Sequence, residues 1–184
     1  MTIDSSMFNL EAAYSNLVSS FYGLENLIFA LSYVMGVALV IRGLMMYRIF
    51  ANQTYGSAQR GEIAGPIVFL IVGIVMLYFP HSIDVSMQTV FGTTEFGRLD
   101  ELTAYQNIHN RENWYQVENI SVKYLKLIGL IAFIRGWVIL SKMGHPGAQP
   151  GSIAKGIVHV IGGVLLINLI GTIKILGNTF GILV

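Results

Sequence analysis

The chain contains no cysteine and few charged residues. Of its 184 residues, only 11% are Asp, Glu, Lys or Arg. The absence of cysteine excludes disulfides, thiolate metal sites and cysteine nucleophiles, and the low charge departs from the 25% or so that is usual in soluble domains. With 54% hydrophobic residues and a mean hydropathy of +0.63, the composition is that of a membrane protein.

The residue patterns that support enzyme chemistry are also missing. The four histidines, at positions 81, 109, 145 and 159, form no H-x3-H or H-E-x2-H pattern. The net charge of +1 excludes a basic nucleic-acid surface. No carboxylate lies inside an apolar stretch, since Glu25 is at the head of the first. We therefore expect no catalytic residue, no metal site and no direct readout of nucleic acid.

Four apolar stretches dominate the chain. They cover positions 26–41, 63–79, 127–140 and 156–173, and the first continues past Arg42 into further apolar residues. A membrane-spanning helix needs about 17–25 residues, so the second and fourth stretches are near the lower limit, and the first and third qualify only if each includes its arginine. We predict an all-α integral membrane protein whose four short transmembrane helices form two tandem hairpins in parallel repeat.

These stretches divide the chain into four expected segments. They are an N-terminal amphipathic helix or a tail (1–25), a first transmembrane hairpin (26–79), a connecting segment (80–123) and a second transmembrane hairpin (124–184). No signal peptide is expected, because the N-terminus lacks a positively charged region and its first charges are acidic.

The distribution of lysine and arginine predicts the orientation. Positions 42–62 carry three basic residues and 135–155 carry three, whereas 1–41 carry none. Cytoplasmic loops are enriched in basic residues. We therefore expect the loops 43–62 and 136–155 to face the cytoplasm, with both termini and 80–123 on the opposite side.

The two hairpins repeat one another in sequence. Aligning Arg42 with Arg135 pairs "GVALVIRG" with "GLIAFIRG", and past the loop "GEIAGPIVFLIVGIVML" pairs with "GSIAKGIVHVIGGVLLI", where seven of 17 positions are identical. Glycine and arginine in register do not follow from apolar composition alone. We interpret the match as a duplicated helical hairpin. Because each copy has an even number of spans, the copies enter the membrane in the same orientation.

Glycines recur at positions that suit close helix packing. The expected packing positions are Gly36, Gly43, Gly73, Gly129, Gly136, Gly163, Gly177 and Gly181. Two glycines seven residues apart fall on one helix face, and small residues let membrane helices approach closely. Two interpretations remain open, namely packing within one subunit and an interface between subunits.

Arginine is costly inside an apolar stretch unless it lies near a helix end. The alignment gives Arg42 and Arg135 the same expected depth, toward the cytoplasmic ends. They are either ordinary topology anchors or groups that meet a lipid phosphate or a water-filled passage, joined there by Lys142 and Lys155. No cofactor is expected, although these residues could hold a phospholipid.

One family resembles the second hairpin. Positions 128–173, through "FIRGW", the glycine-proline loop "GHPGAQPGS" and the following "KG…H…GG…IN", resemble the IcmC/DotE family, with its relatives DotV and TraQ, of the Dot/Icm type IVB secretion and conjugation systems. The resemblance extends more loosely over the first hairpin.

The resemblance implies a non-enzymatic subunit of the bacterial inner membrane, structural or channel-forming, in a machine that exports effector proteins or conjugative DNA. Its implied partners are membrane lipids and other inner-membrane subunits such as DotA, IcmD/DotP and a DotV-like protein, in a homo- or hetero-oligomer. The alternative is a small permease of two tandem hairpins in which Arg135 recognises an anionic solute.

Overall fold

A computed structural model describes residues 10–53, 64–97, 112–144 and 151–181, and these are all helix, turn or short connection without a strand. The elements are α1 (Leu10–Gln53), α2 (Ala64–Leu77), α3 (Phe79–Phe91), α5 (Glu112–Ser141), the 3₁₀ turn η2 (Lys142–Gly144), α6 (Ser152–Ile167) and α7 (Leu169–Thr179). The predicted all-α class is confirmed for these residues.

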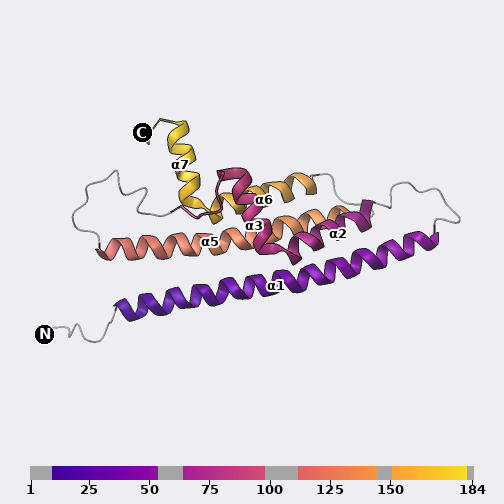
Figure 1. The fold of residues 1–184 in the computed structure, drawn as a ribbon, viewed down its shortest axis with the longest axis horizontal. Coiled ribbons are helices and arrows are strands. Elements are labelled where there is room, and N and C mark those ends of the chain that lie inside the picture. Colours follow the sequence, from indigo (N-terminus) through magenta and orange to yellow (C-terminus); the bar gives the residue numbers. More distant parts are fainter. Residues whose placement is uncertain (1–9, 54–63, 98–111, 145–150, 182–184) are drawn as a thin grey trace.

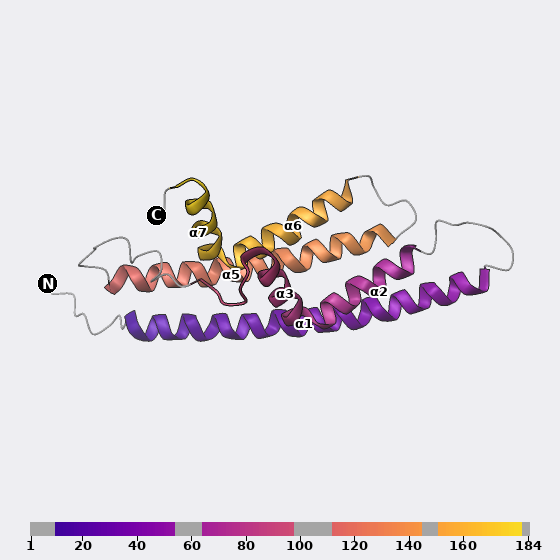
Figure 2. The ribbon, with the colours of Figure 1, turned by 45° about the horizontal axis from the view of Figure 1, so that its top comes forward.

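Two long helices form the frame of the molecule. α1 has 44 residues and α5 has 30, which at 1.5 Å per residue correspond to about 66 Å and 45 Å. Figures 1 and 2 show them running alongside one another in the same direction, with α2 returning along α1 and α6 along α5. Both are long and apolar enough to cross a membrane.

The expected segment boundaries fall inside these helices. α1 continues without a break through position 25, so the N-terminal segment from Leu10 onward belongs to the same helix as the first apolar stretch. α5 begins at Glu112, inside the expected connecting segment 80–123, and α3 occupies another part of that segment. Positions 98–111 lie outside the described residues.

The chain bends at the end of the second apolar stretch and within the fourth, so the four expected spans correspond to two straight helices and two bent helix pairs. The axes of α2 and α3 differ by 92°, and those of α6 and α7 by 95°. α2 and α6 have 14 and 16 residues, or about 21 Å and 24 Å, against a hydrocarbon core of about 30 Å. The described residues therefore contain two straight candidate spans, and up to four if each bent pair counts as one.

The two bends begin differently but are held alike. Pro80 in the first turn of α3 cannot donate a backbone hydrogen bond, whereas Asn168 at the second bend caps α7 by accepting from Gly171 N. After each bend, a hydroxyl donates to carbonyls seven and four residues earlier. The bonds are Ser82 Oγ to Val75 O and Tyr78 O, both 3.0 Å, and Thr172 Oγ1 to Leu165 O at 2.7 Å and Asn168 O at 3.0 Å.

The core lies where α3 enters the space between the two hairpins. Phe79 is 1% exposed and Phe133 is fully buried. The Phe79 ring contacts Phe29 of α1 at a centroid distance of 5.7 Å and Phe133 of α5 at 5.8 Å, and Phe133 contacts Trp137 at 6.2 Å. The first bend thus places the Phe79 side chain between the two hairpins, where it contacts both.

The second hairpin is displaced along the first. Lys126 Nζ on α5 lies 2.9 Å from Glu25 Oε1 on α1. The two residues that meet at this contact are therefore 101 positions apart in the chain. The sequence repeat, by contrast, aligns residues 93 positions apart, such as Arg42 and Arg135. The difference of eight residues corresponds to about 12 Å along the helices. Extended along the two helices, this offset places Arg135 level with about position 34 of α1, eight residues from Arg42. The depth of the two arginines in a membrane stays a prediction.

Candidate functional site

Aligned glycines make aligned contacts in the two hairpins. A Cβ built on Gly36 would lie 2.7 Å from the backbone N of Leu77, and a Cβ on Gly129 would lie 2.7 Å from the backbone N of Ile167. Leu77 and Ile167 are themselves paired by the repeat. Only a residue without a side chain fits at this distance, so each glycine fixes where its hairpin closes.

The other four aligned glycines of the repeat also contact aligned partners. A Cβ on Gly73 or Gly163 would meet the backbone N of Val40 at 2.9 Å or of Phe133 at 2.7 Å. Gly43 and Gly136 face Leu70 and Val160, another aligned pair. These six glycines are buried in contacts within one chain. Of the remaining two predicted positions, Gly177 is buried in α7, whereas Gly181 is exposed with nothing within 4 Å.

The two arginines have different surroundings. The Arg42 guanidinium lies 5.2 Å from the centre of the Phe69 ring, a cation–π contact from α1 to α2. The position aligned with Phe69 is His159, whose Nδ1 donates to Lys155 O at 2.8 Å. Arg135 is exposed and forms no hydrogen bond or ion pair with the described residues.

The four predicted basic residues do not converge on one site. Lys142 lies in η2 and Lys155 in the first turns of α6, and both are exposed. Arg42 and Arg135 are also exposed, on α1 and α5. No contact joins the four within the described part of the chain. Their exposure agrees with contact to lipid or to another subunit and does not separate these alternatives.

A charged pair that the sequence analysis missed joins the two long helices. Lys126 on α5 and Glu25 on α1 form an ion pair at 2.9 Å, with 23% and 20% of their side chains exposed. Glu25 stands at the head of an apolar stretch, and Lys126 lies inside the candidate span Asn119–Ser141. Partial burial strengthens their attraction, because the effective dielectric constant is lower than in water.

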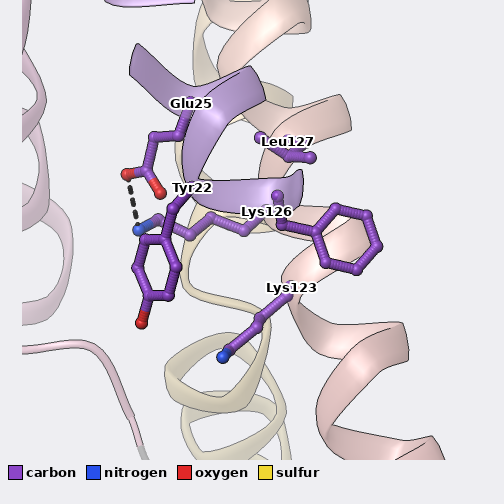
Figure 3. A pocket seen from close by; sticks show the side chains of 6 residues that line it. Tyr22, Glu25, Lys123, Lys126 and Leu127 are labelled. Carbon is purple, nitrogen blue, oxygen red and sulfur yellow. Dashed lines mark hydrogen bonds and ion pairs between the residues drawn. The ribbon is translucent and has the colours of Figure 1, made fainter. Parts of the chain in front are cut away.

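Two cation–π contacts surround this ion pair. Lys126 Nζ lies 4.2 Å from the centre of the Phe96 ring, and Lys123 Nζ lies 5.2 Å from that of Tyr22. Figure 3 shows Lys123 and the Tyr22 hydroxyl extending to the same side, away from Glu25. The inter-helix pocket formed here is lined by Phe21, Tyr22, Glu25, Lys123, Lys126 and Leu127. The spacing of Lys123 and Lys126, three residues apart on one helix face, was the available sequence signal.

The second bend holds a buried amide. Asn168 is 3% exposed, and its Oδ1 accepts hydrogen bonds from Gly97 N at 3.0 Å and Gly171 N at 3.1 Å. Gly97 ends the described connection after α3, so this amide fastens the first hairpin's exit to the second hairpin's bend. Glu95 and Lys174 line a cavity beside it. Among the described residues, no cluster of three His, Asp or Glu could hold a metal ion.

No protein-family model, curated protein or solved structure matches this chain. The resemblance to the IcmC/DotE family therefore remains a prediction from the sequence motifs.

Proposed function

We propose that the protein is a non-enzymatic structural or channel-forming subunit of a membrane assembly, built from two copies of one transmembrane hairpin. The observation that carries the proposal is the agreement between the copies, in which aligned glycines meet aligned partners. Hydroxyls 90 positions apart, on Ser82 and Thr172, hold the two bends with the same pattern of hydrogen bonds. Such agreement supports a duplicated scaffold more than a site of chemistry.

Each bent pair is proposed to belong to one pass across the membrane. Exposed apolar residues of α1 between Leu24 and Ile49 define an apolar belt, about 38 Å long, which suits a hydrocarbon core of about 30 Å with its borders. Phe96 contacts Lys126, and Lys126 pairs with Glu25 at one end of this belt. The chain that enters α2 at the opposite end has therefore crossed the belt by Phe96, so we infer a broken span rather than a re-entrant loop.

The exposed position of Arg135 supports a function within an assembly and not as a single subunit. It is exposed and level with about position 34 of α1, close to the middle of the apolar belt. An arginine at the middle of a bilayer costs from about 2.5 to more than 10 kcal/mol. A neighbouring subunit or a water-filled passage between subunits would lower this cost. Together with the motifs of the second hairpin, this supports a place in a type IVB secretion system of the bacterial inner membrane, beside DotA, IcmD/DotP or DotV-like subunits.

A permease is the second candidate, because each hairpin contains an interrupted helix. Interrupted spanning helices at corresponding positions of two halves are the usual pointer to a transporter binding site, because unwound backbone can coordinate a solute. Here the carbonyls of Val75 and Leu165 already accept bonds from Ser82 and Thr172. The bends are thus internally satisfied, which supports the scaffold proposal over the permease.

The test is export by cells and co-purification from their membranes. We expect Arg42→Leu and Arg135→Leu to abolish export while both variants still insert, and Arg135→Leu to lose co-purified subunits. Arg48→Leu, an exposed arginine six residues further along α1, is the matched control and should keep both. Normal export by the double variant would show that the two arginines serve only as topology anchors. Solute uptake by the purified protein in liposomes, without co-purified subunits, would favour the permease.

A further inference from the structure

We propose that the inter-helix pocket between α1 and α5 binds the phosphate of an anionic phospholipid headgroup. The charge of the pocket is the first reason. It contains Lys123, Lys126 and Glu25, and Glu25 is engaged by Lys126 at 2.9 Å. Lys123 contacts the Tyr22 ring and forms no ion pair with a described carboxylate. Among the described residues, one positive charge therefore has no carboxylate partner at the mouth of the pocket.

The geometry of the two open donors is the second reason. Lys123 and the Tyr22 hydroxyl extend to the same side of the pocket (Figure 3), where an ammonium and a hydroxyl can both donate to phosphate oxygens. The neighbouring Lys126 lies over the Phe96 ring and donates to Glu25. It therefore adds to the positive electrostatic potential of the pocket while it stays paired with Glu25. Basic pockets between membrane helices are a known way of holding lipid headgroups.

The position of the pocket along the helices is the third reason. Tyr22 and Tyr124 are 60% and 55% exposed, and they stand at the end of the apolar belt of α1, next to Leu24. Tyrosines favour the level of the headgroups. A phosphate bound by Lys123 would thus lie in the headgroup layer, at the end of the molecule opposite Arg42.

The surroundings favour a lipid over a dissolved anion. The cavity is about 70 Å³, far below the roughly 300–1,000 Å³ of ordinary small-molecule sites, so it suits a phosphate group and not a whole solute. Leu27 and Ile128 beside it are exposed apolar residues of α1 and α5. They offer the acyl chains a surface that a free phosphate would not use.

The test is lipid binding by the full chain in a mild non-ionic detergent. Native mass spectrometry would count bound lipid while phosphatidylglycerol, phosphatidylcholine or inorganic phosphate is added. We expect phosphatidylglycerol to bind more tightly than phosphatidylcholine, and inorganic phosphate not to compete at equal concentration. Lys123→Gln should weaken phosphatidylglycerol binding about fivefold, the contribution expected of one lysine near a membrane surface.

Two further variants keep the proposal falsifiable. Lys123→Arg should bind as the unaltered chain does, because it keeps the charge and the donors. Arg48→Gln removes the same charge from an exposed position toward the other end of α1 and should change binding by less than twofold. Equal weakening by Lys123→Gln and Arg48→Gln would overturn the site, as would equal binding of the two lipids. Competition by inorganic phosphate would overturn the choice of a lipid as the ligand.

Discussion

Gly129 approaches Ile167 so closely that a Cβ on the glycine would lie 2.7 Å from the backbone N of the isoleucine. A backbone atom cannot rotate away as a side chain can, so the helices must separate to admit even a methyl group. The same holds for Gly36 and Leu77 in the first hairpin. These distances lead to the first prediction.

Gly129→Ala should destabilise the second hairpin by about 1–3 kcal/mol, the range for overpacking of a filled site. Gly162→Ala is the matched control, because nothing lies within 4 Å of a Cβ at that position in α6. Reversible unfolding in mixed micelles measures both. Equal stability of the two variants would contradict close packing at Gly129.

Glu25 and Lys126 should show energetic coupling. A double-mutant cycle of Glu25→Gln and Lys126→Gln should give about 1 kcal/mol, toward the upper end for ion pairs that are largely exposed, since this pair is partly buried. Replacing Lys126→Gln by Lys123→Gln in the cycle provides the control, because Lys123 contacts Tyr22 instead. Coupling that is equally large with Lys123 would show a general charge effect and no specific pair.

The amide of Asn168 should protect two backbone N–H groups from exchange. Asn168→Leu removes the oxygen that accepts from Gly97 N and Gly171 N. Leaving a buried donor unpaired costs about 1–3 kcal/mol, so hydrogen exchange at these amides should become roughly 5 to 150 times faster. Asn168→Asp keeps an acceptor oxygen and should retain most of the protection. Unchanged exchange in the leucine variant would contradict the role of the amide.

The hydroxyl of Thr172 should hold the angle of the second bend. Spin labels at Val158→Cys and Leu176→Cys, exposed on α6 and α7, would be the only thiol sites because the chain has no cysteine. Thr172→Val removes the bonds to Leu165 O and Asn168 O and should broaden the distance distribution, whereas Thr172→Ser should not. A narrow distribution in the valine variant would show that packing alone fixes the bend.

The membrane crossing by α2 and α3 can be tested with single cysteines. We expect Ser57→Cys, which lies between α1 and α2 and outside the described residues, to react with an impermeant maleimide from the cytoplasmic side. Thr93→Cys, after α3, should react only from the opposite side. Reaction of both from one side would mean that the bent pair returns without crossing. Insertion of each full-length variant is checked by membrane fractionation or by the ability of the cells to export substrate.

The sequence predicted what depends on local pattern. Apolar runs indicated the helical class, and the alignment of Arg42 with Arg135 pointed to glycines that do lie at matching contacts. Pro80, directly after the first bend, is a helix-breaking signal that the sequence does carry. The second bend could not be predicted from the apolar pattern, because apolar residues continue on both sides of Asn168 and its bonds come from the Thr172 hydroxyl beyond the bend.

The ion pair was missed for a related reason. Helical spacing relates residues within one helix or within a short hairpin. Glu25 and Lys126 lie on different helices, and they are 101 positions apart in the chain. Their meeting depends on how far one hairpin slides along the other. That displacement is a property of the packed core around Phe79 and Phe133, which no local pattern reports.

The displacement also has a consequence for how the two copies recognise one another. Packed in register, the repeat would place position 118, a glutamate, beside Glu25, and Arg135 beside Arg42. Two like-charged pairs in a poorly hydrated setting would repel. A shift of about two helical turns replaces this repulsion by the attraction between Glu25 and Lys126. These charges thus favour the displaced register of the two similar halves over the symmetric one.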